Sequence, residues 1–312
     1  MRGWVANTDF DWYSFLASRR ALEEVNFWQP SGGRNFHAIT PGEILFFKLK
    51  SPHYAVAGFG VLARHTRLPA WLAWESFGEA NGAPDFETMR RRIERYRGGP
   101  RDPAGSYEIG CLLAVQPVFF DPSEWIPQPT DFGKQTVTGK GYDLAEGEGL
   151  RLWQACRERA GGEFGFALGT GASVASDAPR YGAEQIIRPR LGQGTFRVSV
   201  MDAYGRACAV TTEHSLPVLE AAHIRPYAEG GTHDVSNGIL LRTDIHRLFD
   251  KGFVTVSAKD LRLEVSSKLK EQWENGRIYY DMRGVRIQRP RASREQPDVA
   301  LLQWHNEHRF QP

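Results

Sequence analysis

Cysteine is scarce in this sequence, and long hydrophobic runs are absent. The 312 residues include three widely spaced cysteines, Cys111, Cys156 and Cys208, and no CxxC pair. This pattern excludes a disulfide framework and a zinc site of paired cysteines. No apolar run reaches the roughly 20 residues of a membrane span, and polar residues at positions 7–11 interrupt any signal peptide. We therefore expect a cytoplasmic protein with no membrane partner.

Net charge is also small, at +2 from 39 basic and 37 acidic residues. This balance by itself does not indicate a nucleic-acid partner. The arginines, however, are unevenly distributed, with six in the segment 90–101 and five in the segment 283–294. Because arginine contacts phosphate in a bidentate manner, each cluster indicates either a phosphate-binding surface or an ordinary solvated face.

The chain is long enough for two domains joined by a linker. Within residues 1–130, apolar stretches at 44–49, 54–62 and 109–120 predict strands, and helical spacing predicts a helix over 86–96. Several strands with few helices favour a small β-barrel. We therefore predict an α+β protein whose first domain, residues 1–130, is a barrel.

Residues 131–185 are rich in glycine and polar side chains, with one short predicted helix at 146–159. We interpret this stretch as a linker with little core of its own. A second domain is predicted over 186–312. In it we expect strands at 208–211, 218–224 and 253–256, a helix from about residue 245, and either a helix or a strand at 196–200.

Three polar residues in the second domain suit phosphodiester hydrolysis. His223 falls on a predicted strand, Asn237 in a loop and His246 at a helix start. A neutral imidazole can activate water near pH 7, and a divalent cation can stabilise the leaving oxygen. An asparagine carbonyl can fix the tautomer of the base. The spacing indicates that these side chains converge on one ion and one water.

The residues around them resemble the HNH nuclease family. The resemblance is carried by Leu219-Glu220-Ala221-Ala222-His223-Ile224, Asn237-Gly238-Ile239-Leu240-Leu241-Arg242, Asp244, His246 and Leu248-Phe249-Asp250. It implies a C-terminal ββα-metal domain that cuts double-stranded DNA with a divalent ion such as Mg²⁺ or Mn²⁺, or Ni²⁺ or Co²⁺ in vitro. It also implies that His223 is the general base, that Asn237 orients this base and that His246 binds the metal.

The sequence departs from the family pattern at two points. Many members have a second metal ligand immediately before the base, where this chain has Ala222. Glu220, on the same face of a strand, and Asp244 are the alternative ligands. The cysteine pairs of zinc-bearing members are also missing, so no structural zinc is expected.

Further predicted site residues lie outside this motif. Tryptophans in the first domain alternate with amides, which suits a flipped base that needs stacking and a hydrogen-bonded edge. The segments Trp4–Thr8, Asn26–Ser31 and Pro41–Leu49 are similar to PUA-like modules of the EVE and SRA-like type, which read modified bases. The expected base-binding residues are Trp28, Trp4, Trp12, Asn7 and Asn26, and the expected DNA-backbone contacts are Arg225, Arg242, Arg91 and Arg92.

Together these features predict a modification-dependent restriction endonuclease. The first domain would read a modified base, with modified cytosine as the expected target, and the second would cut as part of a homodimer. Two alternatives remain open at this point. One is an HNH nuclease whose first domain binds unmodified DNA or RNA. The other is a non-catalytic reader with a degenerate nuclease domain.

Overall fold

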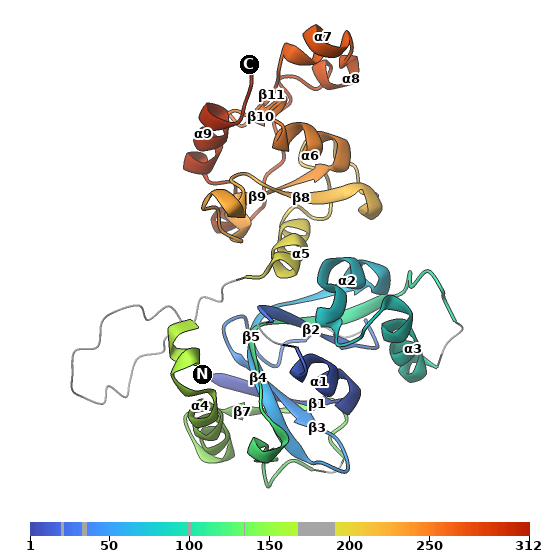
Figure 1. The fold of residues 1–312 in the computed structure, drawn as a ribbon, viewed down its shortest axis with the longest axis vertical. Coiled ribbons are helices and arrows are strands. Elements are labelled where there is room, and N and C mark those ends of the chain that lie inside the picture. The colour runs from blue at the N-terminus through green and yellow to red at the C-terminus, as the bar shows by residue number, and fades with distance from the viewer. Residues whose placement is uncertain (20–21, 33–35, 99–100, 134, 168–190) are drawn as a thin grey trace, which may run out of the picture. The chain divides into compact units, whose positions relative to one another are not determined.

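The computed structural model of this protein describes residues 1–19, 22–32, 36–98, 101–133, 135–167 and 191–312. They form two compact units, Met1–Gly192 and Gln193–Pro312, and each combines helices with strands as predicted (Figure 1). In these ranges no helix is long and apolar enough to cross a membrane.

The N-terminal unit is built on one seven-stranded sheet. Its strands are β1 (Arg2–Thr8), β2 (Glu24–Gln29), β3 (Ile44–Leu49), β4 (Ala55–Pro69), β5 (Glu108–Phe119), β6 (Ile126–Pro127) and β7 (Gly139–Asp143). The pairing order is β2-β5-β4-β3-β1-β7, with β6 beside β4. Among the described strands this path ends at β2 and β7 without closing, so the predicted barrel is not shown.

The predicted strands of this unit are confirmed, and one of them, β4, is longer than expected. β4 and β5 pair antiparallel along most of their length, and β3 pairs antiparallel with β4. Continuous apolar sequence in β3 fits its burial on both faces, where Phe46 and Phe47 are fully buried. Each such ring contributes about 1.5–3 kcal/mol to folding.

Helices lie beside this sheet (Figure 1). Their bounds are α1 (Phe10–Ala17), α2 (Ala70–Phe77), α3 (Phe86–Arg97) and α4 (Gly147–Ala167). The predicted helix over 86–96 is confirmed as α3. Asp85 caps its start by accepting a hydrogen bond from the backbone N–H of Thr88, and Gly98 in the left-handed region ends it.

The predicted linker differs from the structure in its first half. β7 pairs antiparallel with β1, and Tyr142 on it is buried in the core of the N-terminal unit. Leu152 and Cys156 of α4 belong to the same core. The sequence of β7 did not predict a strand, because it is rich in glycine and has a single apolar residue. Residues 168–185 of the predicted linker lie outside the described ranges.

The C-terminal unit has short strands and several helices. Its elements are α5 (Gln193–Ala203), β8 (Leu219–His223), β9 (Gly238–Arg242), α6 (Thr243–Asp250), β10 (Val254–Val256), β11 (Leu263–Val265), α7 (Lys268–Trp273), α8 (Arg277–Tyr280) and α9 (Val299–His308). The undecided segment 196–200 is helical, within α5. The predicted strand at 208–211 is wrong, because the backbone turns back there with Thr212 N–H donating to Cys208.

Candidate nuclease site and aromatic pocket

A strand hairpin followed directly by a helix positions the predicted catalytic residues. β8 pairs antiparallel with β9, and β9 runs into α6 with no intervening loop. His223 at the end of β8 lies opposite Gly238 at the start of β9. A side chain at Gly238 would meet Val200 of α5 at 2.4 Å, so the glycine lets α5 pack against the hairpin.

His223 is half-buried and contacts two other rings. It stacks on Phe196 of α5 with 4.0 Å between ring centroids, and its Nε2 lies 3.1 Å from Nδ1 of His233. Burial, and then positive charge on His233 and His246, lowers the pKa of His223 to about 4. The imidazole is therefore neutral near pH 7, as a general base must be.

Asn237 acts as a clamp on the loop between the two strands. Its side chain is fully buried, and its Oδ1 accepts a hydrogen bond from the backbone N–H of Arg225. Its Nδ2 donates to the backbone carbonyls of Arg225 and Thr232 at 2.9 and 2.8 Å. Asn237 makes no hydrogen bond to His223 in the described chain, so any orientation of the base is transmitted through this loop.

His246 on α6 lies between two carboxylates. Its Nδ1 is 2.7 Å from Glu220 on β8, and its Nε2 is 3.3 Å from Asp250 one helical turn later. Burial opposes the charged form, but the hydrogen bonds and charges of Asp250 and then Glu220 outweigh it, so the pKa of His246 is raised. The site thus concentrates negative charge around one histidine.

This group suits a divalent cation by its chemistry. One imidazole and two carboxylates are donors that Mn²⁺ and related ions accept. In the described ranges, no three His, Cys, Asp or Glu side chains are already spaced to hold an ion. Ion binding would require His246 to release its proton, because a protonated imidazole has no free lone pair.

The other predicted ligand, Asp244, is engaged elsewhere. Both oxygens of Asp244 accept hydrogen bonds from Arg242 at 2.7 and 2.8 Å, and Tyr279 also donates to it. The contact with Arg242 contributes most to lowering the pKa of Asp244. Glu220, which contacts His246 directly, is therefore better placed as a ligand than Asp244.

The arginines predicted to contact the DNA backbone differ in their availability. Arg242 is paired with Asp244, and Arg225 donates to the carbonyl of Glu229 while lying over the ring of Trp304. Arg92 donates to the carbonyl of Gly82. All three therefore have internal partners that compete with phosphate.

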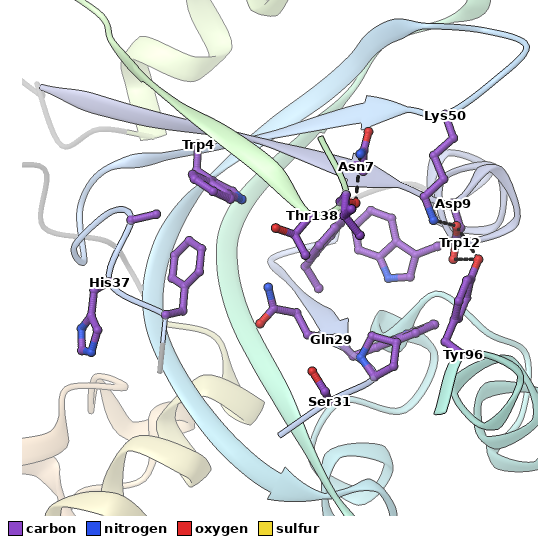
Figure 2. A pocket seen from close by; sticks show the side chains of 16 residues that line it. Trp4, Asn7, Asp9, Trp12, Gln29, Ser31, His37, Lys50, Tyr96 and Thr138 are labelled. Atoms are coloured by element: carbon purple, nitrogen blue, oxygen red, sulfur yellow. Dashed lines mark hydrogen bonds and ion pairs between the residues drawn. The ribbon is translucent and has the colours of Figure 1, made fainter. Parts of the chain in front are cut away.

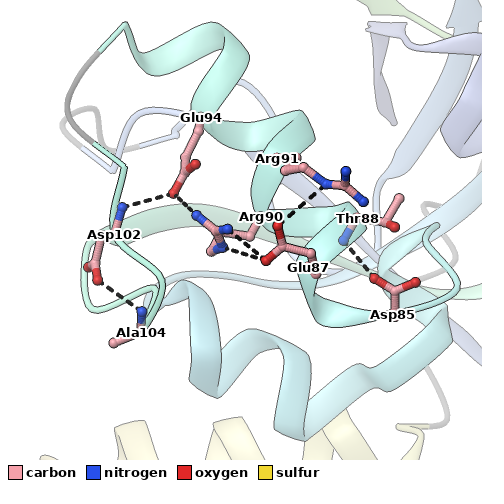
Figure 3. Close-up of polar contacts among 8 residues, drawn as sticks. All are labelled: Asp85, Glu87, Thr88, Arg90, Arg91, Glu94, Asp102 and Ala104. Carbon is pink, nitrogen blue, oxygen red and sulfur yellow. Dashed lines mark hydrogen bonds and ion pairs between the residues drawn. The ribbon is translucent and has the colours of Figure 1, made fainter.

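The arginine cluster on α3 divides in the same way (Figure 3). Arg90 is buried and bonded to Glu87 and Glu94, which themselves lie on α3. Arg91 is exposed and only 3.5 Å from Glu87, and Arg95 is exposed as well. The cluster is thus partly a structural network, and Arg91 and Arg95 are among its exposed members.

The predicted base-binding residues of the N-terminal unit mostly line one pocket (Figure 2). Its volume is about 800 Å³, within the usual range for small-molecule sites. Aromatic rings and polar groups share its walls. The lining includes Trp4, Asn7, Asp9, Trp12, Phe27, Trp28, Gln29, Ser31, Phe36, His37, Lys50, Tyr96 and Thr138.

The tryptophans of this pocket are not equivalent. Trp12 and Trp28 are buried, and their indole N–H groups donate to the carbonyls of Asn26 and Asn81. Trp4 is half-buried and meets Phe36 edge to face at 5.5 Å. Trp4 therefore offers a more accessible ring than Trp12 and Trp28, which are buried in the wall of the pocket.

The two predicted amides have internal partners. Asn7 donates to the carbonyls of Thr136 and Val137 and accepts from Lys48. Asn26 is fully buried, donates to Asn81 and does not line the pocket. The structure thus brings Asn7, but not Asn26, to the cavity.

A hydrogen-bonded group closes one end of the pocket. Lys50 forms an ion pair with Asp9, and the hydroxyl of Tyr96 donates to the same carboxylate (Figure 2). Gln29 and Ser31, by contrast, make no side-chain hydrogen bond within the described chain and point polar atoms into the cavity. The pocket therefore offers both donors and acceptors beside aromatic faces.

Two residues that contact the predicted site residues have no role predicted from the sequence. Asp250 lies four positions after His246, a spacing that places both on one helix face and could have indicated the contact. The sequence gives no such signal for His233, because its contact with His223 depends on the loop conformation.

Comparisons with known proteins bear on each unit. Residues 208–257 match the family model described as HNH endonuclease, which supports the HNH resemblance of this segment. No curated protein matches the chain.

Among solved structures, the ASCH protein from Zymomonas mobilis is 14% identical, with a TM-score of 0.32. The match covers 94% of the ASCH protein and 48% of this chain. Two point mutants of it are 13% and 12% identical, each with a TM-score of 0.30 and each matching 48% of this chain. The match covers 96% of the first mutant chain and 94% of the second.

Proposed function

We propose that this protein is a modification-dependent DNA endonuclease of the restriction type. Its HNH domain hydrolyses phosphodiester bonds, and its N-terminal unit binds a modified base, with modified cytosine as the expected target. The observation that carries the nuclease function is the neutral imidazole of His223 near His246 and its two carboxylates, within the HNH match.

In the proposed reaction, His223 takes a proton from the attacking water. Its lowered pKa keeps it in the accepting form near pH 7. His246, with Glu220 at its Nδ1 or Asp250 at its Nε2, would hold a divalent cation, which when bound would neutralise phosphate charge and stabilise the leaving oxygen. Asn237 keeps the loop that carries the neighbouring residues in place.

The proposed base recognition in the N-terminal pocket rests on its combination of an aromatic ring with hydrogen-bonding side chains. The accessible ring of Trp4 suits stacking, and Gln29 and Ser31 are placed to hydrogen-bond a base edge. A flipped base needs both kinds of contact. This combination favours a base reader over a surface that binds only the DNA backbone.

Cleavage of both DNA strands needs two nuclease domains, so we also propose a homodimer acting on double-stranded DNA. Backbone contacts would come from exposed arginines with no side-chain ion pair among the described residues. They include Arg95, Arg283, Arg286, Arg291 and Arg294.

The experiment that tests the function compares plasmids carrying unmodified cytosine, 5-methylcytosine or 5-hydroxymethylcytosine, each with Mg²⁺ or Mn²⁺. We expect cleavage of one modified plasmid to exceed that of unmodified DNA by about 5–160-fold, the equivalent of one stacked base at 1–3 kcal/mol. Equal rates on all plasmids would argue against modification dependence. An absence of cleavage on every plasmid would argue against the nuclease.

Metal binding is tested by calorimetric titration of the full chain with Mn²⁺. We expect His246→Ala to weaken affinity by at least about tenfold, because it removes a ligand, and either Glu220→Gln or Asp250→Asn to do the same, according to which nitrogen of His246 binds the ion. Asp244→Asn should bind Mn²⁺ as the wild type does, because its carboxylate is occupied by Arg242. Loss of affinity in Asp244→Asn alone would assign the ligand to Asp244 instead.

The same titration has an expected pH dependence. The raised pKa of His246 means that its proton competes with the metal. This proton also stabilises the metal-free fold at pH values below the ordinary histidine pKa, and that contribution is lost as pH rises through the raised value. Mn²⁺ affinity should therefore increase with pH, with release of a proton on binding.

A further inference from the structure

His233 is a loop histidine that is not one of the three predicted catalytic residues, and it contacts His223, the proposed base. His233 lies in the segment between β8 and β9, and its Nδ1 is 3.1 Å from Nε2 of His223. Tyr227 stacks on the other side of His233 with 4.6 Å between centroids and an interplanar angle of 3°. Its ring is therefore fixed in plane and position.

The loop that carries His233 is itself held tightly. Asn237 donates to the carbonyl of Thr232, the residue before His233. A side chain at Gly231 would meet the carbonyl oxygen of Arg225 at 2.0 Å, so the backbone passes there at a distance that glycine permits. Because Asn237 also binds Arg225, one amide fixes the chain just after His223 and just before His233.

The position of the proton shared with His233 determines whether a nitrogen of His223 has a free lone pair to accept a proton from water. If Nε2 of His223 carries the proton and donates to His233, then Nδ1 of His223 keeps a free lone pair. Nδ1 makes no hydrogen bond to any other described residue. If His233 donates instead, Nε2 of His223 is occupied, its own proton moves to Nδ1, and no lone pair remains for water.

We propose that His233 is the positioning residue of the nuclease reaction: in its neutral form, its Nδ1 accepts a hydrogen bond from Nε2–H of His223 and so leaves Nδ1 of His223 as the atom that deprotonates water. This role rests on the proposed nuclease function. In the reaction, Nδ1 of His223 gains the proton of the attacking water and His223 becomes an imidazolium, which neutral His233 stabilises through the same hydrogen bond. Asn237 orients the base indirectly, through His233.

Three variants separate this hydrogen bond from ring packing. His233→Phe keeps a ring to stack on Tyr227 but removes the acceptor, and His233→Asn keeps an acceptor near the Nδ1 position but removes the ring. His233→Ala removes both. We expect His233→Phe and His233→Ala to lower the single-turnover cleavage rate by about 10–100-fold, and His233→Asn to recover most of it.

Rates are measured on the full chain with Mn²⁺, using plasmid DNA and the small diester bis(4-nitrophenyl) phosphate. A His233→Phe variant as active as wild type would overturn the proposal, since packing alone would then suffice. If wild type cleaves neither substrate, the nuclease function itself fails, and this role fails with it. If wild type and His233→Phe both cleave normally, only the role of His233 fails.

A second readout does not depend on activity. The ¹⁵N shifts of His223 in labelled full-chain protein report which ring nitrogen carries the proton. We expect the Nε2–H tautomer in wild type and in His233→Asn, and a mixture of tautomers in His233→Phe. Wild-type protein with the proton on Nδ1 would overturn the proposal, even if every variant were inactive.

Discussion

His223→Ala should lower the single-turnover rate of DNA cleavage by about 10²–10⁴-fold, the usual loss of a positioned general base. The side chain removed is neutral near pH 7, because burial and neighbouring histidines keep its pKa near 4. Its imidazole carries no charge to the DNA, so binding should be nearly unchanged. Rates at saturating enzyme, together with affinity from a binding titration, measure the two effects separately.

A matched control for this variant is His214→Ala, which removes an exposed histidine before β8. It should cleave at the wild-type rate. Melting curves of both variants exclude loss of fold as the cause, since His223 also stacks on Phe196. Cleavage by His223→Ala within a few-fold of wild type would show that another group is the base.

Trp28→Ala should lower the free energy of unfolding of the N-terminal unit by about 3–5 kcal/mol, the typical cost of removing a buried tryptophan. The side chain is only 9% exposed, and its Nε1 donates to the carbonyl of Asn81 at 3.0 Å. The variant would therefore lose packing and leave a buried carbonyl without this partner. Denaturant unfolding followed by tryptophan fluorescence and circular dichroism measures the effect.

Trp4→Ala is the comparison that separates stability from recognition. Trp4 is half-buried at the pocket, so its loss should weaken binding to modified DNA by about 1–3 kcal/mol while the melting temperature changes little. Salt-sensitive binding to unmodified DNA should persist in this variant. If Trp28→Ala instead melts normally and alone loses the preference for modified DNA, Trp28 is the stacking residue.

The sequence was most informative where spacing alone determines geometry. The strand carrying His223 and the helix carrying His246 follow from local patterns, and the HNH match covers both. Likewise, the apolar segments of β3, β4 and β5 predicted their strands. Local periodicity is enough in these cases because one element contains the whole signal.

Prediction failed where a contact depends on loop conformation or on distant pairing. β7 has little apolar character and becomes a strand by pairing with β1, far away in sequence. The burial of Trp28 and Asn26 depends on Asn81, which approaches them from the segment after α2. The contact between His223 and His233 needs the turn that Gly231 and Asn237 hold.

The packing of α5 against the hairpin sets a lower limit on the smallest active fragment. The family match begins at residue 208, but the ring stacked on His223, the proposed base, is Phe196, on a helix that begins at Gln193. Gly238 has no side chain, so without α5 this side of the hairpin would be open to water. A fragment cut at residue 208 would keep every HNH residue and still have a mobile, hydrated base, whereas one starting before Gln193 would retain the enclosed one.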